Sequence, residues 1–269
     1  MSSLEKLSIN ISNFFESNPE LKMERFADFG SEVINTISIT NILNEVLENP
    51  TLLDEVSRES YEVSSNFLKL LLHRDKTTGW GLRVHVFTPE AGQRLDEPWH
   101  EHRWDLVSSV LAGAIHSENA FAEIKSSDQS DDTPEDNQEM YYYSIPDKRI
   151  VGSIQPKLLG KCALQNVFSL SVREGQTYAH QSALAHHLTL LPEDGITITS
   201  VITAPPNRTQ AAFIEYEPLN FKERERPKPL GKQATIASIQ STINEISKPK
   251  ASKDLQESPQ PDYLYLTKS

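Results

Sequence analysis

The sequence predicts a mainly β domain that lies between an N-terminal helical segment and a polar C-terminal tail. From about residue 67 to residue 214, short apolar or alternating stretches are separated by turn residues, a spacing typical of a sandwich or barrel. The first 60 residues instead repeat apolar side chains at helical spacing. We therefore divide the chain into a helical segment over 1–60, a β domain over 61–217, and a linker, short helix and tail over 218–269.

The N-terminal segment has the apolar period of amphipathic helices. The first helix is indicated by apolar residues three or four positions apart, namely Leu4, Leu7, Ile11 and Phe14. Ser3 is a possible N-cap, and Asn18-Pro19 is expected to end the helix. A second apolar cluster over 42–47 marks another helix, so we expect an accessory helical layer.

The β domain is predicted from segments with strand signals that are bounded by Gly, Pro, Asn or Ser. These segments are 67–72, 80–87, 106–112, 140–145, 164–172, 184–191 and 195–204. The stretch 126–138 contains no apolar residue and is expected to be a solvated loop between two strands. After residue 217 the chain becomes rich in Pro and Lys, and a short amphipathic helix is expected over 235–247.

The most informative segment of the β domain is a pair of histidines one residue apart, His100 and His102. Alternate residues of a strand point to the same face, so these two imidazoles can bind one metal ion together. The apolar run 106–112 follows and stops at Gly113, so we expect the pair at the start of a core strand. The alternative is that both histidines pair with nearby carboxylates at a barrel mouth.

A metal site needs a third protein ligand, and three histidines occur together later in the chain. His186 has the parity of the apolar residues Leu184 and Leu188, whereas His187 has the opposite parity. We therefore expect His186 to point inward and to be the ligand. His180 has the same parity as His186, so it could line the same cavity, or it could replace His186 as the ligand if a turn at Gln181-Ser182 changes the phase.

These residues resemble the cupin superfamily, whose small β-barrels carry a first motif with His-x-His and a second motif with one more His. The resemblance covers about 67–214. In this sequence Gly92 is similar to the glycine that opens the first motif, and Gly113 to the glycine that closes it. The resemblance implies that His100, His102 and His186 are metal ligands. It also implies a cupin-type β-barrel, a jelly-roll-like double-stranded β-helix, and a possible homodimer.

One departure from the cupin pattern concerns the carboxylate ligand. Cupins commonly place a Glu a few residues after the histidine pair, where this sequence has Asp105, Leu106 and Val107. Asp105 has the wrong parity relative to His102, so we interpret the site as lacking that carboxylate. A site of three histidines resembles the thiol dioxygenase branch, of which cysteine dioxygenase is a member. That resemblance implies Fe(II), although imidazole also suits Zn, Cu and Ni.

The sequence-based hypothesis is therefore a mononuclear non-haem Fe(II) dioxygenase, an oxidoreductase that acts on a small polar substrate. One alternative is a non-redox cupin, such as an isomerase, cyclase or lyase, in which the metal acts as a Lewis acid. Another is a non-catalytic barrel that binds a small ligand. Arg83 and Tyr178 are the candidate catalytic residues that contact substrate, Trp104 is a candidate pocket wall or core residue, and His85 is expected to be an ordinary strand residue.

Composition limits the other function classes. The formal net charge is -12, whereas nucleic-acid binding draws on clustered Lys and Arg, so we expect no nucleic-acid partner. No apolar run approaches the length of about 18 to 20 residues that a membrane span needs, and no secretory signal is recognisable. The single cysteine, Cys162, is expected to be a buried structural thiol in a reducing compartment. We therefore expect a cytoplasmic protein with no membrane partner.

Overall fold

The structure is a computed structural model of the 269-residue chain. It describes residues 1–64, 67–89, 93–125, 140–146, 156–191, 195–216, 229–248 and 263–266. The stretch 126–138, expected to be a solvated loop, and most of the linker and tail lie outside these ranges. No helix in the described part of the chain is both long enough and apolar enough to cross a membrane.

Helices form one layer of the molecule. They are α1 (Ser3–Ser17), α2 (Met23–Val33), α3 (Thr36–Glu48), α4 (Pro50–Glu59) and α5 (Lys232–Ile246). The expected cap of α1 is wrong by one position, because the Ser2 hydroxyl accepts from the Glu5 N–H and Glu5 bonds back to the Ser2 N–H. Asn49 caps α4, whose first residue is a proline that needs no backbone donor.

The strands form two seven-stranded sheets. The first sheet has the order β1-β2-β3-β12-β6-β10-β14, and we call it the helix-covered sheet. Its strands are β1 (Tyr61–Ser64), β2 (Phe67–Arg74), β3 (Gly81–Phe87), β6 (Leu106–Ala112), β10 (Thr177–His180), β12 (Thr197–Thr203) and β14 (Tyr263–Leu266). All described pairings in it are antiparallel except that of β14 with β10.

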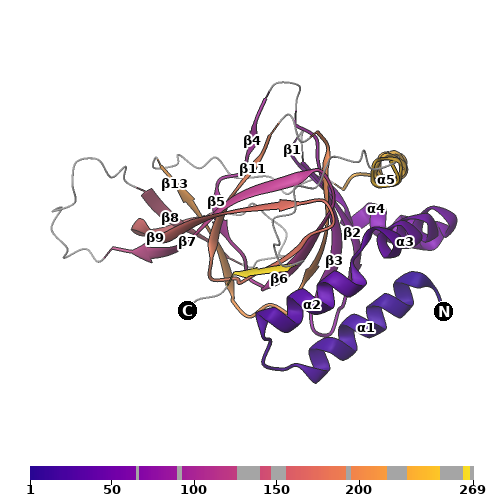
Figure 1. The fold of residues 1–269 in the computed structure, drawn as a ribbon, viewed down its shortest axis with the longest axis horizontal. Coiled ribbons are helices and arrows are strands. Elements are labelled where there is room, and N and C mark those ends of the chain that lie inside the picture. The colour runs from indigo at the N-terminus through magenta and orange to yellow at the C-terminus, as the bar shows by residue number, and fades with distance from the viewer. Residues whose placement is uncertain are drawn as a thin grey trace, which may run out of the picture.

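The second sheet has the order β4-β11-β5-β13-β8-β9-β7, with a further pairing of β11 with β7, and we call it the histidine sheet. Its strands are β4 (Leu95–Asp96), β5 (Trp99–Glu101), β7 (Ala114–Ile124), β8 (Met140–Pro146), β9 (Lys157–Arg173), β11 (Ala185–Leu190) and β13 (Gln210–Glu215). Every pairing in it is antiparallel. The predicted class, a mainly β fold with an N-terminal helical layer, is therefore confirmed (Figure 1).

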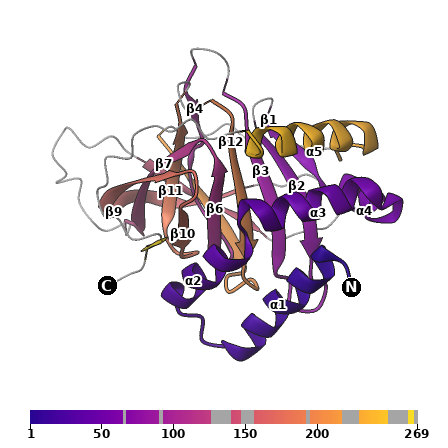
Figure 2. The ribbon, with the colours of Figure 1, turned by 45° about the vertical axis from the view of Figure 1, so that its right-hand side comes forward.

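The helices pack on the outer face of the helix-covered sheet (Figure 2). Helix residues such as Phe26, Ile39 and Ile239 share one buried apolar cluster with Leu82 and Val84 of β3. In α2, a Cβ at Gly30 would collide with the Val107 side chain of β6, so only glycine allows this close approach of helix to sheet.

The inner faces of the two sheets enclose a second apolar cluster. Its buried members come from both sheets and are Phe67, Phe87, Val110, Ile115, Leu170, Val172, Leu184, Leu188 and Leu190. Because side chains alternate along a strand, Leu82 and Val84 face the helices whereas Arg83, His85 and Phe87 face this interior. Polar and charged side chains of β3 therefore line the space between the sheets.

The expectation that the His-x-His pair begins the core strand 106–112 is wrong. β5 ends at Glu101, and β6 begins at Leu106 in the opposite sheet. The chain crosses between the sheets through Arg103 and Trp104, where Asp105 accepts from the Ser182 N–H at 2.8 Å and from the Asn207 amide at 3.1 Å. These contacts with distant segments stabilise the corner between β5 and β6. The apolar run 106–112 did not predict this corner.

A glycine permits the turn that returns the chain to the histidine sheet. Gly113, between β6 and β7, has φ +74°, in the left-handed region that other residues rarely adopt. A Cβ there would also lie 2.5 Å from the Thr197 Oγ1 atom. The predicted glycine turn after 106–112 is present.

Candidate metal centre

Three histidines meet on the inner side of the histidine sheet. His100 lies in β5, His102 follows directly after β5, and His186 lies in β11 opposite His100 in the strand register. One ring nitrogen from each can be chosen so that all three lie within 4.8 Å of one another. Ring centroids are 4.1 Å apart for His100 and His186, and 4.8 Å for His102 and His186. These atoms are close enough to share one metal ion.

Hydrogen bonds orient two of the three rings. His100 Nδ1 donates to the Pro98 carbonyl at 2.9 Å, which leaves Nε2 as its unprotonated nitrogen. His186 Nδ1 lies 3.2 Å from His180 Nε2. When His186 donates this bond, its Nε2 also carries the free lone pair. Such partners of the second ring nitrogen are typical of metal-binding histidines.

Burial favours the neutral form of these rings. Desolvation lowers the pKa of His100, and it lowers the pKa of His102 and His186 well below the usual value. A metal ion requires unprotonated imidazole, so little proton release would oppose binding near pH 7. The residues therefore fit a divalent transition metal with nitrogen ligands.

His180 lies beside the cluster but does not belong to it. Its side chain is 1% exposed, and burial lowers its pKa to about 3. Its Nε2 faces His186 Nδ1 rather than the space shared by the three ligand atoms. The structure puts His180 behind His186, as its hydrogen-bond partner.

The neighbour of His186 points the other way. His187 Nδ1 lies 3.5 Å from a Glu118 carboxylate oxygen, and its Nε2 lies 3.7 Å from Asp96. Its ring stacks on Trp99 at 5.6 Å. The structure therefore places His186 inward and His187 outward, on opposite faces of β11.

The other sequence-predicted site residues also lie in the interior. Burial raises the pKa of Tyr178 to about 12, and Tyr178 lies opposite Ser108 in the register of β10 and β6. Arg83 donates to the Thr203 hydroxyl at 3.3 Å, and its guanidinium lies 5.1 Å from the centre of the Trp104 ring. Trp104 in turn stacks on His102 with ring centroids 6.1 Å apart. Trp104 thus connects Arg83 to the histidine cluster.

A carboxylate lies next to His100. The Glu97 Oε2 atom is 3.9 Å from His100 Nε2, and the Glu97 side chain is 18% exposed. Burial is the main cause of the raised pKa of Tyr178, and the Glu97 charge also contributes to it. Glu97 is one of the nearby carboxylates of the sequence-based alternative, in which the histidines pair with acids at a barrel mouth, and it lies close to His100.

The outer side of the same strands holds a different polar group. Glu101 is 4% exposed and accepts hydrogen bonds from the Tyr142 hydroxyl at 2.8 Å and from Arg208. Arg208 also donates to the Ser182 carbonyl at 2.8 Å. This outer ion pair ties β5, β8 and the turn before β11 together. The sequence gave no signal for it, because its members come from four separate segments.

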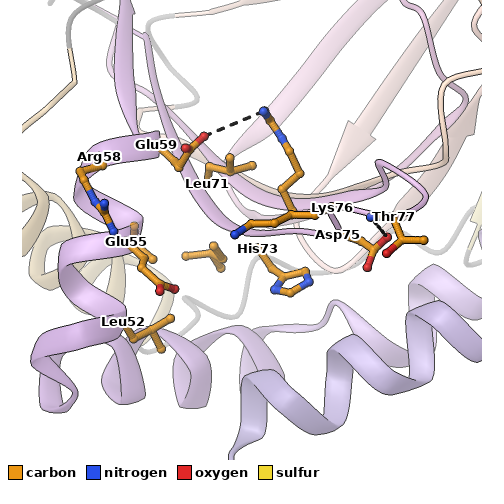
Figure 3. A pocket seen from close by; sticks show the side chains of 12 residues that line it. Leu52, Glu55, Arg58, Glu59, Leu71, His73, Asp75, Lys76 and Thr77 are labelled. Atoms are coloured by element: carbon orange, nitrogen blue, oxygen red, sulfur yellow. Dashed lines mark hydrogen bonds and ion pairs between the residues drawn. The ribbon is translucent and has the colours of Figure 1, made fainter.

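A cavity of about 620 Å³ lies outside the barrel, between α4 and the end of β2 (Figure 3). Glu55 and Glu59 of α4 line it opposite His73 and Lys76, and Glu59 lies 3.9 Å from Arg74. None of the three clustered histidines lines this cavity. We do not take this cavity as the functional site. It is lined by both acidic and basic side chains, and the three histidines that could bind a metal lie elsewhere.

No family model matches the sequence, and no curated protein matches it either. Solved structures with a similar fold include DMSP lyases at 18% identity, covering 51% of this chain and 47% of that one, with a TM-score of 0.28. An oxalate decarboxylase variant from Bacillus subtilis shares 10% identity over 54% of this chain and 27% of that one, with a TM-score of 0.30. This chain spans about half or less of the length of these two structures.

A third similar structure is a hydroquinone 1,2-dioxygenase in complex with Cd²⁺ and 4-hydroxybenzonitrile. It shares 12% identity over 58% of this chain and 72% of that one, with a TM-score of 0.31. Identities and scores of this size leave the chemistry to be argued from the site itself. The two facing, mainly antiparallel sheets and the three-histidine cluster are the features that the resemblance to the cupin superfamily implies.

Proposed function

We propose that this protein is a mononuclear metal-dependent enzyme of the cupin type, a non-haem Fe(II) dioxygenase that acts on a small polar molecule. His100, His102 and His186 are the proposed ligands. The observation that carries the proposal is the approach of three imidazole nitrogens, from half-buried histidines whose pKa is lowered, to within 4.8 Å of one another. Cytoplasmic location and a homodimer remain expectations.

The ligand set supports oxygen chemistry. His100, His102 and His186 would hold the ion, and a bound Fe(II) would supply the capacity to activate O2 next to a bound substrate. Imidazole also binds Zn, Cu and Ni, so the donor set alone does not select iron. The Fe(II) assignment follows from the resemblance to three-histidine dioxygenases.

Residues of this chain would perform the supporting steps. The Glu97 carboxylate lies where it can accept a proton from a substrate held beside His100. The Tyr178 phenol stays protonated at neutral pH because burial raises its pKa, so it can donate a hydrogen bond to a substrate oxygen. The Trp104 ring stacks on His102 and covers one side of it.

A second candidate function is a metal-dependent lyase, isomerase or cyclase without O2. The observation that favours it is the Glu97 carboxylate 3.9 Å from His100 Nε2, with the Tyr178 phenol packed in the same interior between the sheets. A carboxylate base and a neutral phenol acid suit proton abstraction next to a carbonyl that a metal polarises. Both candidates use the same ligands and differ in whether O2 is consumed.

The first experiment is elemental analysis of the purified protein, followed by O2-electrode traces after anaerobic loading with Fe(II). We expect about one iron per chain and substrate-dependent O2 uptake, with small thiols tested first. The control is the double variant His100→Ala, His102→Ala, which should retain neither metal nor uptake. Stoichiometric Zn, Cu or Ni without O2 uptake would favour the second candidate, and no retained metal would leave a ligand-binding barrel.

A further inference from the structure

A second cavity, of about 800 Å³, lies against the histidine sheet on the side away from the metal cluster, and we call it the outer cavity. It is lined from β5, β7, β8 and β9, and the last three strands lie far from the helices (Figure 1). Because residues alternate along a strand, Glu101 faces this cavity whereas His100 faces the other side of β5. The volume is within the range of about 300–1,000 Å³ that small-molecule pockets have.

The outer ion pair forms a polar end of this cavity. In the described part of the chain, both hydrogen bonds to the Glu101 carboxylate end on Oε2, and they come from Tyr142 and Arg208. Arg208 uses Nη1 for its bonds to Glu101 and to the Ser182 carbonyl. Glu101 Oε1 and the remaining guanidinium nitrogens of Arg208 therefore keep the capacity to bond a ligand. One ion pair thus offers an acceptor and a donor side by side.

A bulge in β9 brings further polar groups into the outer cavity. The register with β7 shifts there, so that Asn166 and Val167 of β9 lie opposite a single residue of β7. Asn166 has φ +55°, in the left-handed region, which asparagine adopts more readily than most residues. Gln165, Asn166 and Phe168 consequently all line the cavity, although neighbours in a regular strand point to opposite faces. Bulges that redirect side chains in this way are frequent next to functional sites.

Apolar side chains lie beside these polar groups. Phe121 of β7 and Phe168 of β9 line the cavity and are partly buried, and Ala122 adds a small apolar surface between polar neighbours. The two amides of Gln165 and Asn166 each offer both a donor and an acceptor. A ligand that fits this wall combines an apolar face with several hydrogen-bonding groups.

The charges of the cavity favour a ligand without net charge. Among the residues that the structure describes, three charged side chains line it, and Glu101 and Arg208 neutralise each other. The third, Glu123, is exposed to solvent, where water screens its charge. No histidine lines the described wall, so the donor set does not suit a transition metal.

We propose that the outer cavity is a binding site for a neutral sugar of monosaccharide size, separate from the metal centre. Each sugar hydroxyl both donates and accepts a hydrogen bond, which matches the mixed set of carboxylate, guanidinium and amide groups. Neighbouring hydroxyls can bond Glu101 Oε1 and Arg208 together, while the C–H face of the sugar ring packs against Phe168. This inference does not depend on the proposed function, because the two sites lie on opposite sides of β5.

The test uses the methyl glycosides of glucose, galactose and mannose as probes. Each is titrated into the full chain, and saturation-transfer difference NMR gives its affinity. We expect at least one to bind with a Kd of about 1 mM or tighter. Gln165→Ala and Asn166→Gly each remove one amide and should weaken that binding about threefold to tenfold, as the loss of one neutral hydrogen bond does. Glycine suits position 166 because it adopts a positive φ without strain.

Two controls separate this site from the rest of the molecule. Val167→Ala changes a 53% exposed side chain of the same bulge that does not line the described cavity, and it should leave the affinity unchanged. The double variant His100→Ala, His102→Ala should bind the glycoside as the wild type does. Gln165 and Asn166 are exposed, so both amide variants should keep the Tm of the wild type.

Four results would overturn the inference. The first is no binding of any of these glycosides at about 10 mM. The second is binding that neither amide variant weakens, since the sugar would then lie elsewhere. The third is loss of binding in the double histidine variant, which would assign the sugar to the metal centre. The fourth is tighter binding of glucuronate or choline than of the glycosides, which would make the ligand a charged molecule.

Discussion

Ionisable side chains alternate between the inner and outer faces of β5 and β11. The outer ones lie near groups of opposite charge, whereas the inner ones approach one another. On the outer face, Glu101 bonds Arg208 and Tyr142, and His187 lies near two carboxylates. On the inner face, His100 and His186 approach each other and no described opposite charge closes the cluster apart from Glu97 at 3.9 Å. Charge pairs on the outer face stabilise the fold. Imidazole nitrogens that converge on the inner face, with no strong ion pair among the described residues, indicate a binding site.

The largest expected effect separates the two adjacent histidines of β11. His186→Ala removes one of three proposed ligands and should lower metal affinity by at least about a thousandfold, so that the purified protein no longer retains metal. His187→Ala removes an outer side chain and should leave metal content near that of the wild type. Elemental analysis of both variants decides the matter, and equal metal loss would contradict the assignment of faces.

The outer ion pair should matter for stability rather than for metal. Arg208→Met leaves the buried Glu101 carboxylate with only the Tyr142 bond and should lower the free energy of unfolding by about 2 kcal/mol. Urea denaturation measures this change. Metal stoichiometry at saturating metal should stay at one per chain, and loss of metal binding together with unchanged stability would reverse the roles of the two faces.

His180 tests whether the inner face has a supporting layer. His180→Ala removes the partner of His186 Nδ1 and should weaken metal affinity by about tenfold, within the range found for partners of metal-binding histidines. His180→Gln keeps a hydrogen-bond acceptor and should recover part of that affinity. Competition with a chelator gives both affinities. A loss as large as that of His186→Ala would show that His180 is itself a ligand.

The smallest effect concerns pH. Burial, followed by the charges of Lys69 and Arg83, lowers the pKa of His85 well below 6.5 in the folded protein. Below pH 6.5 the unfolded chain therefore takes up a proton that the folded chain does not, so this residue's contribution is lost as pH falls and is complete above pH 6.5. His85→Gln should make the metal-free protein's stability fall less steeply between about pH 6.5 and 4, by at most about 1.4 kcal/mol per pH unit. A slope that does not change would contradict a neutral His85.

Local patterns in the sequence were sufficient to predict most of the elements. The helical period of Leu4, Leu7 and Ile11 corresponds to α1, and the apolar run before Gly113 corresponds to β6. The parity of His186 with Leu184 and Leu188 agrees with its inward position, because alternation along one strand needs no knowledge of the rest of the fold.

Features that depend on contacts between distant segments could not be predicted in this way. The break between β5 and β6 is held by Ser182 and Asn207, which lie far along the chain. The same is true of Arg208 behind Glu101 and of His180 behind His186.

Because one of its histidines lies in the corner between β5 and β6, the cluster can stabilise that corner when it binds an ion. His102 lies on the short connection from the histidine sheet to the helix-covered sheet, whereas His100 and His186 lie in strands of the histidine sheet. An ion bound by all three residues would cross-link β5, the corner after it and β11, which are remote in the chain. Amide hydrogen exchange at β5, β11 and the corner should then slow together when metal is added, and local opening of the sandwich would set the rate at which metal escapes.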